Sequence, residues 1–188
     1  MMIYTEQVFV RTESRENVET ALRELLERSS FEFVETDLPP LKRHAVVDRR
    51  TVRHFYVGSP VYGWVCILEA WSGDEALAPA LAERLRTSAV WFSFYSVSEE
   101  FKYAIYEGAK LVERQHFRPA EPTKKRILAF TGQRKPEPSE VQLFQAADEF
   151  YKKHGLPWPL YGYEQIDAHP DKAEYFHHLN FRRIDTPS

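Results

Sequence analysis

The sequence predicts an α+β fold in which a mostly antiparallel sheet is covered by three or four helices. Two successions of strand, helix and strand, one at the N-terminus and one in the middle of the chain, suggest ferredoxin-like halves. A strand, a glycine turn and a second strand within 101–114 predict a hairpin that extends the sheet. Hydrophobic residues make up 43% of the 188 residues, a share that can form an ordinary globular core.

The N-terminal unit consists of a strand over 4–10, a helix that begins after Ser14 and a strand over 31–35. Ser14 is a good helix N-cap because its hydroxyl can accept a hydrogen bond from a backbone N–H of the first turn. The apolar residues that follow recur at the spacing of one helix face, so we expect this face to pack on the sheet. They are Val18, Ala21, Leu22, Leu25 and Leu26.

The middle unit contains the continuously apolar segment 63–71, which predicts a buried central strand. A strand over 52–57 is expected to precede it, with Gly58, Ser59 and Pro60 as the turn between the two. The helix that follows carries Leu77, Leu81 and Leu85. Segment 89–97 is rich in aromatic residues that favour strands and completes the unit.

The last third of the sequence is less regular. A helix is expected after Ser139, which forms a capping-box pattern with Gln142. A short helix opened by Pro170 is expected to end at His177 and His178, where positive charge is favourable near the helix dipole.

Composition limits the class of protein. Twenty-five Lys and Arg against 28 Asp and Glu give a formal net charge of −3, which disfavours nucleic acid because such binding needs a concentrated positive field. The single cysteine, Cys66, forms no internal disulfide, and we find neither a signal-peptide pattern nor an apolar run long enough to span a membrane. We therefore expect a soluble cytoplasmic protein without membrane contact. It is predicted to be one domain over 1–188, with a weak boundary within 117–125 as the alternative.

The residues from 61 to 114 resemble a recurrent pattern in uncharacterised bacterial α+β proteins. Its elements are a Trp-Val strand at Trp64 and Val65, a leucine-rich helix, an apolar strand and a hairpin around Gly108. The resemblance covers about a third of the chain, and at 96–100 the sequence Ser-Val-Ser-Glu-Glu stands where the pattern has an acidic turn. It implies a bacterial domain without an established activity and transfers no catalytic residue.

The sequence contains no motif for a nucleotide, a cofactor or a catalytic triad. Cys66 lies between Val65 and Ile67 in an apolar segment, which favours a buried structural cysteine over a nucleophile. None of the seven histidines shows the spacing of metal ligands. We therefore expect neither a metal nor a cofactor, and an enzyme is the less favoured class.

Aromatic residues supply the candidate ligand-binding or partner-binding positions. Prolines hold one group outside regular structure, which suits a lid over the sheet or, alternatively, a partner-binding patch: Trp158, Tyr161 and Tyr163. A second group comes from different predicted strands and could line a pocket: His54, Tyr56, Trp64 and Tyr103.

These observations favour a non-catalytic binding or protein-interaction domain, including an inhibitor or an immunity-type role. The alternative is a small-molecule-binding protein or an enzyme whose pocket is assembled from sheet residues. A protein partner is expected, and an exposed edge strand would also allow a homodimer.

Overall fold

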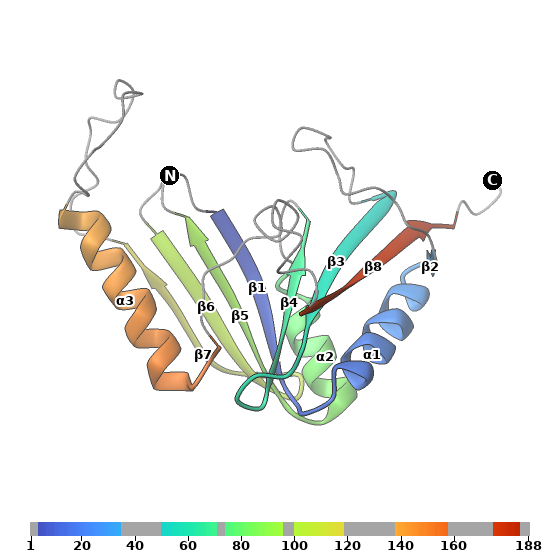
Figure 1. Cartoon of the computed structure of the whole chain (residues 1–188), viewed down its shortest axis with the longest axis horizontal. Helices are drawn as coiled ribbons and strands as arrows, with labels where there is room; N and C mark the ends of the chain where they lie inside the picture. The colour runs from blue at the N-terminus through green and yellow to red at the C-terminus, as the bar shows by residue number, and fades with distance from the viewer. Residues whose placement is uncertain are drawn as a thin grey trace, which may run out of the picture.

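The computed structural model describes residues 4–34, 50–70, 74–95, 100–118, 138–157 and 175–184, and the structural statements below concern these residues. Its strands are β1 (Tyr4–Arg11), β2 (Phe31–Phe33), β3 (Val52–Gly58), β4 (Trp64–Glu69), β5 (Ser88–Tyr95), β6 (Glu100–Glu107), β7 (Lys110–Phe117) and β8 (Phe176–Arg183). Its helices are α1 (Arg15–Arg28), α2 (Leu77–Leu85) and α3 (Pro138–His154). These elements form one antiparallel sheet and three helices, which confirms an antiparallel α+β architecture (Figure 1).

The sheet has the strand order β2-β8-β3-β4-β1-β5-β6-β7. The predicted hairpin is confirmed as β6 and β7, and β7 pairs only with β6 among the described strands, so the hairpin extends the sheet at one edge. A register shift between Ile105 and Tyr106 interrupts its ladder. At the centre, β4 lies between β3 and β1, as its continuously apolar sequence predicts.

Helix α1 begins where the sequence places it. The hydroxyl of Ser14 accepts a hydrogen bond from the backbone N–H of Asn17 at 3.2 Å, and this satisfies one of the donors that a helix start leaves unpaired. The predicted apolar face is buried at Val18, Ala21, Leu22 and Leu26.

None of the helices in the described part of the chain is long and apolar enough to cross a membrane.

The sheet has a hydrophobic core on each face. Val8 and Val10 of β1 pack with the apolar residues of α1 and α2, whereas Phe9 between them packs with α3 on the opposite face. This alternation follows from the two-residue period of a strand. Because β1 is buried on both sides, its side chains join the two cores, and each fully buried Phe or Leu stabilises the fold by about 1.5–3 kcal/mol.

Helix α3 is attached to its sheet face by aromatic packing and one buried hydrogen bond. Phe150 stacks on Tyr103 at a ring-centroid distance of 4.1 Å. The Tyr151 hydroxyl donates to Oε1 of Gln7 at 2.6 Å. The helix begins at Pro138, so Ser139 lies in its first turn rather than before it. Proline fits a first helical position because the N–H groups of the first turn have no acceptor within the helix, so its lack of an N–H removes no hydrogen bond.

The expectation that His177 and His178 end a helix is wrong. Both lie in β8, which pairs with β3 on one side and β2 on the other. The local sequence misleads because the apolar residues of β8 alternate with His178 and Asn180 on one face, and Asn is depleted in strands. Pairing with β3 decides the outcome. The expected helix at Pro170 lies outside the described residues.

A buried ion pair joins the start of β3 to the end of β4. Nε and Nη2 of Arg53 donate to the two carboxylate oxygens of Glu69 at 2.8 and 2.9 Å, and Nη2 also reaches Asp74 at 3.2 Å. Arg53 and Glu69 are both buried. Two parallel hydrogen bonds give the pair a defined geometry, which helps to fix the position of β3 beside β4.

Replacement of Glu69 by Gln is expected to lower the free energy of unfolding by about 3 kcal/mol, because the buried guanidinium of Arg53 then loses its bidentate carboxylate. Chemical denaturation measures the change. Glu24→Gln is the matched control: Glu24 pairs with Arg84 at 2.6 Å on the surface, where solvent screens the pair, so its loss should cost much less than the loss of Glu69. Equal effects of the two substitutions would contradict this role for Glu69.

Candidate binding cleft

Four of the seven predicted site residues lie in the described structure, all on the sheet face that carries α3. His54 and Tyr56 come from β3, Trp64 from β4 and Tyr103 from β6. The structure separates them into three settings: a buried cluster, a cleft and the packing surface of α3. Trp158, Tyr161 and Tyr163 lie outside the described residues.

His54 and Tyr56 belong to a buried polar and aromatic cluster with β8. Nδ1 of His54 lies 2.5 Å from Oδ1 of Asn180, and since an amide oxygen only accepts, the proton is on Nδ1. His178 lies between the rings of Tyr56 and His54, with centroid distances of 4.7 and 5.8 Å. The cluster exists because cross-strand pairing places His54 opposite Asn180 and Tyr56 opposite His178.

The imidazole of His178 is kept neutral. Burial, and to a smaller extent the neighbouring His54, lower the pKa of His178 from 6.5 to about 4. A neutral ring stacks in this cluster without bringing a charge into the sheet. His177 points the other way, where its Nδ1 lies 2.8 Å from Glu19 of α1 at the surface.

Acidification is expected to destabilise the protein through His178. Its pKa is lower in the folded state, so the unfolded chain takes up this proton first, and stability is lost as pH falls from about 6.5 to about 4. We expect a loss of roughly 1–2 kcal/mol, because partial exposure of the ring reduces the effect. Denaturation at several pH values measures it. His178→Gln should flatten the profile and His177→Gln should not; the reverse result would contradict this assignment.

Tyr103 packs against α3. Its ring stacks on Phe150, and its hydroxyl donates to Oε1 of Glu113 at 2.6 Å. Burial, followed by this hydrogen bond to a carboxylate, raises the pKa of Tyr103. The hydroxyl therefore stays protonated as a hydrogen-bond donor, and the role of Tyr103 is to hold the helix.

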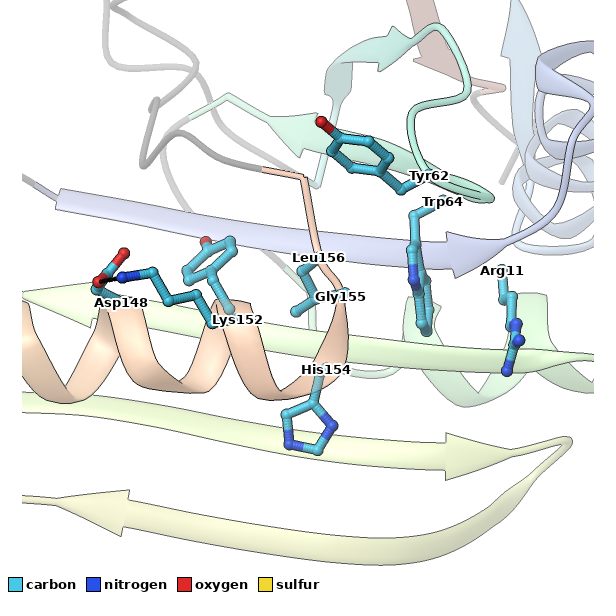
Figure 2. A pocket seen from close by; sticks show the side chains of 9 residues that line it. Arg11, Tyr62, Trp64, Asp148, Lys152, His154, Gly155 and Leu156 are labelled. Carbon is cyan, nitrogen blue, oxygen red and sulfur yellow. Dashed lines mark hydrogen bonds and ion pairs between the residues drawn. The ribbon is translucent and has the colours of Figure 1, made fainter.

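Trp64 lines an open cleft of about 600 Å³ between the β3–β4 hairpin, the end of β1 and the last turn of α3 (Figure 2). The lining residues are Arg11, Tyr62, Trp64, Asp148, Tyr151, Lys152, His154, Gly155 and Leu156. Arg11 and Trp64 are directly opposite each other on β1 and β4, so their side chains leave the sheet on the same face. Gly155 has a φ of +62°, which ends α3 and turns the chain towards Leu156.

Tyr62 occupies an unfavourable position at the tip of the β3–β4 hairpin. Backbone hydrogen bonds in both directions join Val61 and Trp64, leaving Tyr62 and Gly63 as the two turn residues. Both have positive φ, +52° and +79°, as a type I′ turn requires. Asn-Gly is the preferred pair in such turns, and a bulky residue at positive φ is strained. The side chain of Tyr62 is 85% exposed, so core packing does not compensate for this strain.

The charged side chains that line the cleft differ in whether they have an ion-pair partner. Nζ of Lys152 lies 2.5 Å from Oδ2 of Asp148 one helical turn away, so these two charges compensate each other. Within the described ranges, the guanidinium of Arg11 has no hydrogen-bond or ion-pair partner. One uncompensated positive charge therefore remains beside the ring of Trp64.

Cys66 follows Trp64 by two residues on β4, so its side chain lies on the same face of the sheet. It is partly buried, and desolvation raises the pKa of its thiol to about 12. The protonated thiol is a poor nucleophile. In the part of the chain that the structure describes, no group of three or more His, Cys, Asp or Glu side chains is placed to hold a metal ion.

Arg11 and Tyr62 are not among the residues predicted from the sequence. The predicted turn at Gly58, Ser59 and Pro60 is wrong, because the hairpin reverses at Tyr62 and Gly63. A bulky residue followed by Gly between two strands was the available signal, because Gly is the preferred second residue of a two-residue hairpin turn. For Arg11, nothing in the local sequence indicates that it lies opposite Trp64.

Comparisons of the chain with protein families, with curated proteins and with solved structures found no match.

Tyr62→Asn is expected to stabilise the fold. Asn adopts positive φ more readily than Tyr, so the free energy of unfolding should rise by roughly 1 kcal/mol and the melting temperature by about 2–4 °C. Thermal and chemical denaturation measure the two quantities. Tyr62→Ala is the comparison, because it removes the ring and keeps the strained backbone. If Asn gives no gain over Ala, the strain assigned to Tyr62 is absent.

Proposed function

We propose that this protein is a non-catalytic binding domain and that a protein partner docks at the cleft between the β3–β4 hairpin and the end of α3. The observation that carries the proposal is Tyr62. Its backbone is strained and its ring is exposed, so the residue costs stability without contributing to the core. Tyrosine and tryptophan are enriched among the residues that dominate protein interfaces.

The shape of the cleft favours a protein partner over a small molecule. Small-molecule sites enclose about 70–90% of the ligand surface. Here one wall is a hairpin tip whose aromatic ring stands largely in solvent (Figure 2). A projecting tip beside an open cleft fits a surface that a partner covers from outside, and burial of Tyr62 would then supply binding energy.

The chemistry of the described residues also favours binding over catalysis. The thiol of Cys66 is held protonated, and His178 and His54 interact with each other and with Asn180 away from the cleft. An inhibitor or immunity-type role is one form of such a domain. A small-molecule-binding protein or an enzyme remains the alternative, and a second copy of this chain is the alternative partner.

We further infer that strands β3, β4, β1 and β5 with helices α1 and α2 form a ferredoxin-like unit to which the other strands are added. Strand order and helix placement support this interpretation, since both helices pack on one face and each crossover joins two parallel strands that flank one antiparallel strand. Strands β1 and β3 flank β4, and strands β4 and β5 flank β1. One cysteine with a protonated thiol suits a reducing compartment, and we propose that the domain acts in the cytoplasm.

Partner capture with matched variants tests the proposal. The immobilised full chain is exposed to lysate of the cells that make it, and retained proteins are quantified by mass spectrometry. Tyr62→Asn should reduce retention of the partner at least about tenfold while the fold becomes more stable.

Ile184→Asn is the control. Ile184 is 48% exposed and follows β8, whereas the cleft lies at β1, β4 and α3, so this substitution removes apolar surface elsewhere. Equal retention by the wild type and Tyr62→Asn would contradict docking at the cleft. Retention of no protein at micromolar concentration would remove the main support for a binding function.

A further inference from the structure

Arg11 is the chemically distinctive group of the cleft. It is the last residue of β1 and lies directly opposite Trp64 on β4. Its side chain is exposed, and within the described residues its guanidinium has no partner. Arg is enriched at interfaces because its planar guanidinium binds a carboxylate through two parallel hydrogen bonds.

The other groups around the cleft do not neutralise Arg11. Lys152 is paired with Asp148, and Glu13, which lies against Gly63 of the hairpin turn, does not line the cleft. Burial and the neighbouring Lys153 lower the pKa of His154, so its ring carries no charge at neutral pH. The cleft therefore has one positive charge to offer and no free acid among its lining residues.

Apolar side chains line the cleft together with Arg11. Tyr62, Trp64 and Leu156 provide two rings and an aliphatic side chain around the same opening (Figure 2). Figure 2 shows Arg11 and Trp64 side by side, pointing in the same direction from neighbouring strands. A ligand that contacts both Arg11 and this apolar surface is best matched if it carries an anionic group next to an apolar one.

We propose that the partner presents an acidic side chain to Arg11 and a neighbouring aromatic or large aliphatic side chain to Tyr62 and Trp64. This inference rests on the proposed binding function and names the chemistry of the docking segment. An acidic peptide fits better than nucleic acid, because a phosphate backbone needs several cations along its path, whereas here Asp148 lies beside Lys152.

Selection from a displayed library of random peptides tests the chemistry without a known partner. The target is the immobilised full chain, in parallel with Arg11→Glu and Tyr62→Asn. Wild type should enrich peptides in which Asp or Glu stands near an aromatic or large aliphatic residue. Arg11→Glu should reverse the preference and enrich Lys or Arg in place of the acid.

Affinity of one synthetic peptide from the wild-type selection gives the quantitative test. Arg11→Glu should weaken it at least about tenfold, and added salt should weaken the wild-type complex because the ion pair is exposed. Arg182→Glu is the matched control, because Arg182 is an exposed arginine of β8, away from the cleft. It should leave the affinity unchanged, and thermal melts confirm that all variants fold.

The outcomes separate the two proposals. Two outcomes would overturn the acidic partner but not the docking site: Tyr62-dependent peptides that contain no acidic residue, and peptides that bind Arg11→Glu as well as the wild type. Peptides that bind independently of Tyr62 would overturn the docking site itself. Binding of single-stranded RNA that Arg11→Glu abolishes, with no acidic peptide enriched, would overturn the peptide in favour of nucleic acid.

Discussion

The pairing of β1 with β4 on one side and β5 on the other is the constraint on which the rest of the structure depends. Strand β1 is buried on both faces, so its alternate side chains belong to two different cores. Helices α1 and α2 complete one core and α3 completes the other. The same pairing places Arg11 opposite Trp64, and the cleft is a direct consequence of this register.

The two ends of β4 differ: a buried ion pair stabilises one end, and a strained, exposed residue lies at the other. At one end, Glu69 is buried and held by both nitrogen donors of Arg53, so that β3 and β4 are joined firmly. At the other end, the chain reverses through Tyr62, whose positive φ and exposed ring weaken the hairpin. A protein retains a strained, exposed aromatic residue at a cost in stability when that residue serves another purpose, and a site of interaction is the purpose that its surroundings fit.

The candidate residues chosen from the sequence share a sheet face but not a site. Strand alternation explains the first fact, because His54, Tyr56, Trp64 and Tyr103 all fall on the face of α3. Strand order explains the second, since four interstrand spacings separate β3 from β6, a distance of roughly 19 Å across the sheet. No pocket of ordinary size joins residues that far apart, and the part of the sheet between them carries α3.

The local elements follow from short stretches of sequence: Ser14 and the apolar face after it define α1, and the continuous apolar run defines β4 as central. These features depend on hydrogen bonds and burial periods within a few residues. Long-range strand pairing sets three other features: the placement of β8 beside β3, the stacking of neutral His178, and the position of Arg11 opposite Trp64. They arise from pairing between segments far apart in the chain. The stabilisation comes from contacts between the two paired strands, so neither segment alone indicates it.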